Sequence, residues 1–241
     1  MCNSVRDDDH NEADRWSTVG TQARSGVTRQ TIIDSAVDLF GERGFGGTGL
    51  IDIIERSGLT KGAFYYHFRT KESVAAAIID DANRVIAEAM SATLATTSPM
   101  LENLITAAFV VTDLNERTKL VRVGNMLRQS LIQVSPAATE SFNDDRGSLL
   151  AASFSQAIAE GDLRDDINPE AVGYTAWAAM LGSRILSDAT GIDVITGTEN
   201  VLRVILAGAV AEQSRQYCDQ FIARMAQRYA QADKLVSSSA P

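Results

Sequence analysis

The strongest constraint on this chain lies in residues 48–68, where two short helical segments flank a single glycine. Thr48 is expected to cap a helix over residues 50–57, because its hydroxyl can accept a hydrogen bond from the first turn. Gly58 then ends that helix after about two turns. A second short helix is expected over residues 61–68. Two short helices joined by a tight glycine turn are typical of a helix-turn-helix, a motif that binds DNA.

The second segment combines apolar anchors with polar groups. Leu59, Phe64 and Phe68 are expected to anchor it to the rest of a small domain. Thr60 is expected to cap it, which makes its N-terminus a suitable place for a phosphate. The positions left to face a duplex are Thr60, Lys61, Gly62, Ala63, Tyr65, Tyr66 and His67.

The rest of the chain continues the helical pattern, with apolar residues repeating at three- and four-residue steps. No repeat of about 20–50 residues is present, which argues against a solenoid. The sequence therefore predicts an all-α protein, with a three-helix helix-turn-helix domain followed by a larger helical domain. Helices are expected near 28–44, 50–57, 61–68, from 70 onward, and near 100–116, 118–133, 137–160, 169–188, 198–213 and 214–232.

Charge is distributed unevenly along the chain. The whole chain carries a formal net charge of −9. The net charge is −3 over residues 1–23, +2 over residues 24–71 and −8 over residues 72–241. Because phosphates attract the basic segment and repel the acidic remainder, the helix-turn-helix end is expected to face a nucleic acid.

Other features narrow the class of protein. The two cysteines, Cys2 and Cys218, give neither a disulfide framework nor metal-ligand spacing, so no metal and no cofactor are expected. The N-terminus has no apolar run of the kind that marks a secretory signal, and no membrane helix is expected, so the protein is predicted to be cytoplasmic. Two histidines without a phosphate loop or a catalytic triad spacing predict that the chain is not an enzyme.

The DNA-binding segment closely resembles the signature of the tetracycline-repressor family over some forty residues. The residues that carry the resemblance are Gly44-Phe45, Thr48, Asp52-Ile53-Ile54, the run from Ser57 to Phe68, and Lys71-Glu72. The resemblance implies a recognition helix in the major groove of an operator. Taken singly, each tyrosine could be an ordinary surface aromatic and His67 a core histidine, but in this register together they favour DNA binding.

The resemblance also implies roles for individual residues. Lys61 and Gly62 would meet base edges, with Thr60 and Ala63 close by, since a lysine can donate to guanine in the major groove. The residues implied to contact phosphates are Thr48, Tyr65, Tyr66, His67 and Lys71.

Members of this family bind a small molecule among their middle helices and dimerise through two late helices. The dimer helices would here be 169–188 and 198–213, through stripes that contain Val172, Ala176, Ala179 and Met180, and Val201, Val204, Ile205 and Gly208. These stripes could equally pack within one subunit. Candidate pocket residues, which could equally be ordinary core, are Phe109, Met126, Leu127, Phe142, Trp177 and Met180.

A finer resemblance links the chain to the γ-butyrolactone receptors of actinobacteria. It rests on residues 68–79, on residues 180–184 and on the general length of the chain. Those receptors typically contact the lactone with a mid-chain tryptophan. This chain has no tryptophan between Trp16 and Trp177, so the resemblance does not extend to that contact.

Together these observations predict the organisation of the chain and its function. The expected parts are a disordered tail (1–22), a helix-turn-helix domain (23–72), a ligand-binding and dimerisation domain (73–233) and a second tail (234–241). The expected function is that of a homodimeric transcriptional repressor, released from its operator by a small, largely apolar ligand. Two alternatives are a regulator or activator that needs no ligand, and an enzyme.

Overall fold

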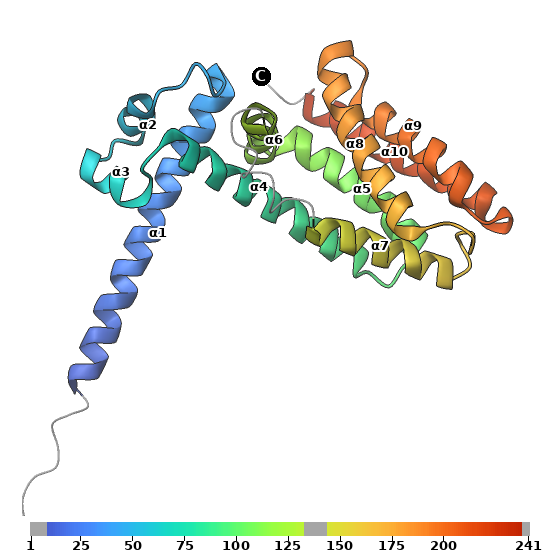
Figure 1. The fold of residues 1–241 in the computed structure, drawn as a ribbon, viewed down its shortest axis with the longest axis horizontal. Helices are drawn as coiled ribbons and strands as arrows, with labels where there is room; N and C mark the ends of the chain where they lie inside the picture. The colour runs from blue at the N-terminus through green and yellow to red at the C-terminus, as the bar shows by residue number, and fades with distance from the viewer. Residues whose placement is uncertain (1–8, 133–143, 238–241) are drawn as a thin grey trace, which may run out of the picture. The chain divides into compact units, whose positions relative to one another are not determined.

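The computed structural model describes residues 9–132 and 144–237, and its long elements are all helices (Figure 1). This agrees with the predicted all-α fold. The helices are α1 (Asp9–Arg43), α2 (Leu50–Ser57), α3 (Lys61–His67), α4 (Lys71–Leu94), α5 (Met100–Arg117), α6 (Lys119–Ile132), α7 (Asp144–Ala159), α8 (Pro169–Thr190), α9 (Val194–Ala209), the short 3₁₀ helix η2 (Glu212–Ser214) and α10 (Arg215–Ser237).

The chain divides into two compact units. The first comprises the chain up to Asp80 together with Val123–Ser130, and the second comprises Asp81–Arg122 and the chain from Leu131 onward. Helix α4 passes from one unit to the other without interruption. In the described residues no helix is long and apolar enough to cross a membrane.

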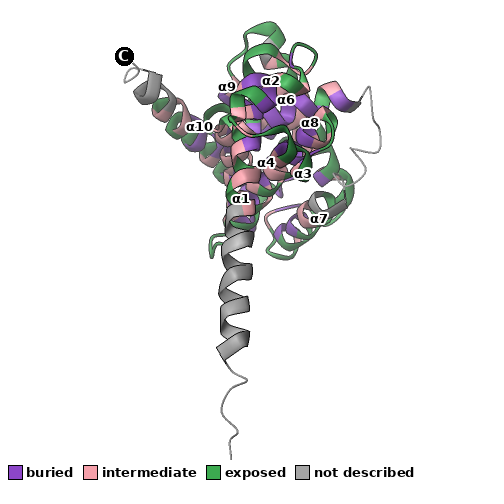
Figure 2. Ribbon diagram, turned by 90° about the vertical axis from the view of Figure 1, so that its left-hand side faces the viewer, coloured by how far each residue is buried: buried purple, intermediate pink, exposed green. Residues whose placement is uncertain are grey.

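The core of the first unit is formed where α1 packs against α2 and α3. Phe40 on α1, Ile53 on α2 and Phe64 on α3 are completely shielded from solvent, as is Ile78 on α4. Figure 2 colours buried residues purple along the ribbon. Burial of such side chains stabilises the fold by about 1.5–3 kcal/mol each. Helices as short as α2 and α3 are unstable alone, so this packing holds them in place.

Helix α1 begins at Asp9, well before the start near Thr28 that the apolar pattern predicts. The apolar stripe marks only the part of the helix that packs on the core, from Ile32 to Phe40. Residues 9–22, expected to be a disordered tail, continue the same helix. Polar residues do not end a helix, and no proline interrupts residues 9–31, although they contain Gly20 and Gly26. The apolar pattern therefore located the packed part of the helix and missed its start.

The second unit has its own apolar core, to which α5, α7, α8, α9 and α10 contribute. Phe109, Ile105 and Ile222 lie at its most buried positions. Helix α9 begins at Val194, earlier than the predicted residue 198, because Asp193 caps it by accepting a hydrogen bond from the Thr196 amide. Gly197 therefore lies inside the helix. Its hydrogen atoms leave room for Ser183, whose Oγ would be 2.5 Å from an added Cβ.

Candidate nucleic-acid interface

Helix α3 is fixed at both ends and by one buried ring. Thr60 is its N-cap and accepts a hydrogen bond from the Ala63 amide at 3.2 Å, as expected from the sequence. The Phe68 amide donates to the Phe64 carbonyl at 3.0 Å where the helix ends. Phe64 is fully buried and Phe68 nearly so, which confirms both as anchors. The helix is therefore held with a defined face outward.

The outward face of α3 carries Lys61, Gly62, Tyr65 and Tyr66. Residues four apart share a face of a helix, so Lys61 lies beside Tyr65 and Gly62 beside Tyr66. Tyr65 is 45% exposed and Tyr66 is 80% exposed. The Tyr66 ring therefore buries little of its surface within the chain and stays accessible to another molecule.

Gly62 has no role in packing the chain. A Cβ added there would meet no atom within 4 Å, and the residue does not adopt a positive φ angle. Glycine inside a helix is less favourable than alanine by about 1 kcal/mol. The absence of a side chain at this exposed position is therefore unexplained by the fold and fits a surface that must come close to a partner.

Two of the predicted interface residues, Ala63 and His67, are less exposed than the others on α3. Ala63 is half-buried and presents only a small group beside Lys61. His67 is also half-buried, and its ring meets that of Tyr66 edge-on at 5.0 Å between centroids. Its imidazole therefore helps to set the direction of the exposed Tyr66 ring.

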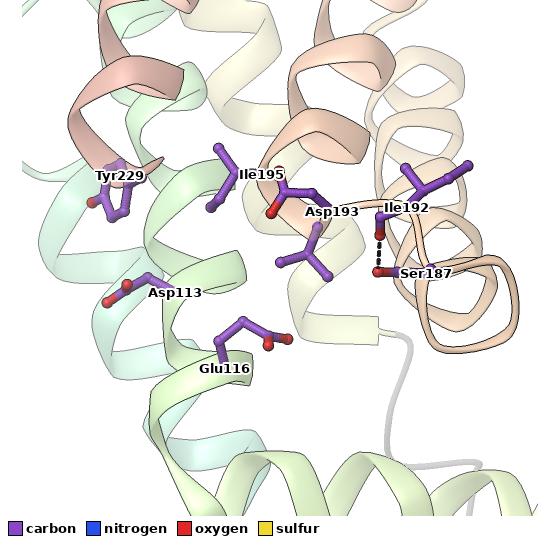
Figure 3. Close-up of a pocket in the computed structure, with 9 residues that line it drawn as sticks. Asp113, Glu116, Ser187, Ile192, Asp193, Ile195 and Tyr229 are labelled. Atoms are coloured by element: carbon purple, nitrogen blue, oxygen red, sulfur yellow. Dashed lines mark hydrogen bonds between the residues drawn. The ribbon is translucent and has the colours of Figure 1, made fainter. Parts of the chain in front are cut away.

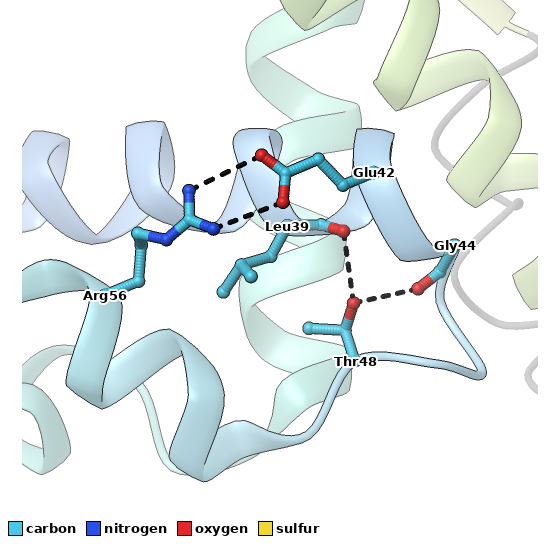
Figure 4. A network of polar contacts seen from close by, with 5 residues as sticks. All are labelled: Leu39, Glu42, Gly44, Thr48 and Arg56. Carbon is cyan, nitrogen blue, oxygen red and sulfur yellow. Dashed lines mark hydrogen bonds and ion pairs between the residues drawn. The ribbon is translucent and has the colours of Figure 1, made fainter.

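Thr48 is not a helix cap, contrary to the sequence interpretation. Gly49 is the N-cap of α2, and its amide donates to Asp52 at 2.7 Å. Thr48 is 1% exposed, and its hydroxyl lies 2.9 Å from the Gly44 carbonyl oxygen and 3.3 Å from that of Leu39 (Figure 4). With its hydroxyl directed into the chain, the Thr48 side chain is not available to a phosphate.

Lys71 also contacts the chain itself. Its ammonium group donates to the carbonyl oxygens of Phe45 and Thr48, both at 2.8 Å, and lies 4.2 Å from the centre of the Phe45 ring. These contacts tie the first turn of α4 to the loop before α2. Lys71 thus stabilises the loop that leads into the helix-turn-helix. Its predicted contact with a phosphate stays a prediction.

The other cations of the first unit differ in availability. Arg56 on α2 makes two hydrogen bonds to Glu42 on α1, at 3.1 and 3.5 Å, so its charge is largely neutralised (Figure 4). Arg69, which follows α3, is exposed, and the guanidinium of Arg29 lies 5.6 Å from the centre of the adjacent Phe68 ring. The sequence interpretation passed over both arginines, although their contribution to the local positive charge could have indicated them.

The predicted ligand residues are not brought together in one described cavity. Phe109, Trp177 and Met180 belong to the second unit, whereas Met126 and Leu127 belong to the first. Phe109 is fully buried and stacks on Tyr229, which makes it core. Trp177, Met180 and Met126 are half-buried, and Leu127 is fully buried. Phe142 lies outside the described residues.

The face of α8 and α9 that is free in one chain differs from the predicted stripe. Val172 and Ala176 pack against the core of the second unit, so these two positions follow the alternative in which the stripe is internal. The large apolar side chains left in solvent are Tyr174, Ile185 and Leu186 on α8 and Val204 on α9. Tyr174 is 70% and Val204 76% exposed. Two of the four positions predicted on α8 are therefore internal, and dimerisation through α8 and α9 stays a prediction.

Known proteins resemble this chain in sequence and structure. Residues 32–78 match the family model "Bacterial regulatory proteins, tetR family". The A-factor receptor protein of Streptomyces griseus is 40% identical over 60 residues, a match that spans 25% of this chain and 22% of the receptor. The transcriptional repressor Rv3405c of Mycobacterium tuberculosis is 28% identical over 196 residues, or 75% of this chain and 85% of that protein.

The fold of a solved γ-butyrolactone receptor, described as ArpA-like, superposes with a TM-score of 0.69 at 26% identity. It covers 85% of this chain and 99% of the receptor.

A buried anchor, a capped recognition helix and an exposed face of lysine and tyrosine define a helix-turn-helix DNA-binding protein. The matching family model over residues 32–78 and the relatives show that the chain is similar to the tetR family of bacterial regulatory proteins. This agrees with the resemblance seen in the sequence and with the expectation of a regulator rather than an enzyme.

Proposed function

We propose that this chain is a homodimeric repressor that holds operator DNA with the exposed face of α3 and leaves it when a small, largely apolar molecule binds to the second unit. The observation that carries the DNA-binding step is the exposure of Tyr65 and Tyr66 on a helix anchored by the buried Phe64. The residues proposed to meet DNA are Thr60, Lys61, Gly62, Ala63, Tyr65, Tyr66, His67 and Lys71, with Arg69 and Arg29 added.

Each group on that face suits a different part of the duplex. Lys61 stands in the first turn of α3, where a recognition helix meets base edges, and can donate to guanine O6 or N7. The tyrosine hydroxyls suit phosphate oxygens, as do Arg69 and Arg29 beside the other end of the helix. The amides at the start of α3 add a partial positive charge toward a phosphate.

Dimerisation is supported by the exposed apolar face of α8 and α9. Leaving Tyr174, Leu186 and Val204 in water is unfavourable, and a second copy of the same face would cover them. Two copies would also present two recognition helices, which is how such proteins read paired half-sites about one helical turn apart.

Release by a ligand is supported by the relatives. Two of them are named as receptors, one for A-factor and one for a γ-butyrolactone, and a third is named a repressor. A ligand can release DNA only if it binds the released form more tightly than the DNA-bound form. The ligand class stays open, because the tryptophan typical of lactone receptors has no equivalent between Trp16 and Trp177.

The DNA-binding step is tested by Lys61→Ala. Genome-wide footprinting first supplies the operator, and fluorescence anisotropy then measures its affinity for the full chain. Loss of a base contact is expected to weaken binding by about 10–100-fold, with discrimination against non-operator DNA reduced. Lys119→Ala, which removes an equally exposed lysine from α6, is the matched control and is expected to bind normally. Equal affinity of both variants would contradict the assignment.

Release is tested separately on the wild-type dimer. A library of small metabolites is screened for compounds that raise the melting temperature, since a ligand of the native state stabilises it. Compounds that bind are then added to the operator complex, and the anisotropy is expected to fall. Binding without any loss of DNA would instead favour a regulator that does not respond through release.

A further inference from the structure

The second unit contains a cavity of about 260 Å³ that none of the predicted ligand residues lines (Figure 3). It lies where the ends of α5 and α8, the start of α9 and a residue of α10 meet. Its volume is below the range of about 300–1,000 Å³ of drug-sized sites, so it suits a compact molecule. The lining residues are Asp113, Glu116, Ser187, Gly191, Ile192, Asp193, Val194, Ile195 and Tyr229.

The α8–α9 side of this cavity is built by local hydrogen bonds. The Ser187 hydroxyl donates to the Ile192 carbonyl (Figure 3). Gly191 ends α8 in a left-handed conformation, with φ 70°, and its amide donates to the Ser187 carbonyl. Asp193 caps α9 through one carboxylate oxygen, which accepts from the Thr196 amide and hydroxyl at 2.8 Å each. The wall is thus fixed before any molecule binds.

Tyr229 forms an aromatic wall of the same cavity. Its ring stacks on that of the fully buried Phe109, with 5.6 Å between centroids and planes 16° apart. Burial raises the pKa of the Tyr229 hydroxyl, while the nearby charge of Arg228 lowers it and that of Asp113 raises it by a smaller amount. The tyrosine is therefore a neutral phenol at physiological pH. With Ile192, Val194 and Ile195, it places apolar side chains beside the acidic ones of the cavity.

The charge at the cavity is negative. Three of the nine lining residues are acidic, and none of the nine is basic. Arg117 pairs with Asp113 and largely neutralises it, and Arg122 donates to the main-chain carbonyl of Glu116 at 2.8 Å. The carboxylates of Glu116 and Asp193 supply the remaining negative charge among the lining residues. Glu116 stands in the last turn of α5 and Ser187 in the last turn of α8. The C-terminal ends of α5 and α8 carry a partial negative charge, and the N-terminal end of α9 carries a partial positive charge that Asp193 caps.

We propose that this cavity binds a small organic cation, with the ammonium group near Glu116 and Asp193 and the apolar part against Tyr229 and Ile195. A carboxylate binds an ammonium group through charge-assisted hydrogen bonds, and an aromatic face attracts a cation as well. The site goes beyond the repressor function, since binding here requires neither DNA nor a second chain.

The test is isothermal titration calorimetry of the full-length wild-type protein with phenethylammonium. Two probes of similar size serve for comparison: the neutral 3-phenylpropanol and the anionic 3-phenylpropionate. The cation is expected to bind at least about tenfold more tightly than either, because one charge-assisted contact is worth about 1.5–3 kcal/mol. Equal binding of the three probes, or no binding of the cation, would overturn the proposal.

Glu116→Gln locates the site. The carboxylate is exposed, so its replacement by an amide of the same shape leaves the fold intact. Phenethylammonium is expected to bind the variant at least about fivefold more weakly. Glu170→Gln, at an exposed position in the first turn of α8, is the matched control and should bind as the wild type does. Unchanged affinity in Glu116→Gln, or an equal loss in both variants, would show that the cation does not bind here.

Discussion

Neighbouring residues of α3 lie in opposite environments, and this contrast was predictable. Phe64 is fully buried, whereas Tyr66, two positions later, is 80% exposed. Helical periodicity separates such positions, because they point in different directions around a helix of 3.6 residues per turn. The inward orientation of the Thr48 and Lys71 side chains was harder to predict, since polar side chains usually face water. Their partners are main-chain carbonyls of α1 and of the loop after it, and no side-chain pattern records where those carbonyls point.

Gly62→Ala is expected to separate stability from DNA binding. The new methyl group meets no atom of the chain, and alanine favours the helix, so the free energy of unfolding should rise by about 0.5–1 kcal/mol. Affinity for the operator should fall, because the methyl group would stand between the helix and the groove. Urea denaturation and anisotropy measure the two quantities. A variant that is stabilised and binds DNA normally would show that Gly62 does not approach the duplex.

Cys218 on α10 is expected to make stability depend on alkaline pH. Burial raises the pKa of its thiol to about 11 from an ordinary value of 9.0, and Asp219 adds to the effect. The unfolded chain therefore loses this proton first. The stabilisation is complete below pH 9 and is lost as the pH rises toward 11, by at most about 1.4 kcal/mol per pH unit.

Comparison with Cys218→Ala isolates the contribution of the thiol. Chemical denaturation at pH 8, 9, 10 and 11 gives the free energy of unfolding of both proteins, while tyrosines titrate alike in each. The decline should be steeper in the wild type than in the variant. Parallel curves would mean that the thiol ionises equally in the folded and unfolded chains.

At the scale of elements, helix type and order followed from the sequence, and several helix ends did not. Periodicity located the packed face of α1, but its start at Asp9 precedes that face. Gly197 lies just before the predicted helix start at residue 198, and in the structure it allows α9 to pass close to Ser183. A glycine between apolar residues is compatible with either role, and only the neighbouring helix decides between them.

The loop before α2 provides a test at this scale through Thr48→Val. Valine keeps the shape and removes the hydroxyl that bonds to Gly44 and Leu39, so the free energy of unfolding should fall by about 1–2 kcal/mol. Thr31→Val, which removes an exposed hydroxyl bonded to its own helix, is the matched control and should change stability little. A Thr48→Val protein that is as stable as the wild type but binds the operator more weakly would contradict this. That result would support the phosphate contact that the sequence resemblance implied for Thr48.

At the scale of the whole molecule, partner contacts were the least predictable feature. An apolar stripe on a helix has the same sequence pattern whether it faces the core or another chain. Val172 faces the core, and Tyr174 faces solvent two residues later. The acidic character of the second unit was visible in the sequence. The cavity lined by Glu116 and Asp193 was not, because its residues come from helices far apart in the chain.

Val204→Glu is expected to break the dimer, because a second copy of the same face would bury the new charges. Sedimentation velocity should show a dissociation constant raised by more than about tenfold, and operator affinity should fall with it. Val27→Glu places the same charge at an exposed valine of α1, which is 69% exposed, and should leave the dimer unchanged. A Val204→Glu protein that sediments as the wild type does would locate the subunit contact elsewhere.

The glycine on the outward face of α3 has a practical implication for protein engineering. A library screened for heat resistance alone would favour alanine at position 62, since a methyl group there meets no atom of the folded chain. On the proposed approach of Gly62 to the duplex, such a screen would improve stability while selecting clones with weaker operator binding. Redesign of this protein as a biosensor therefore has to measure operator binding in every selection round.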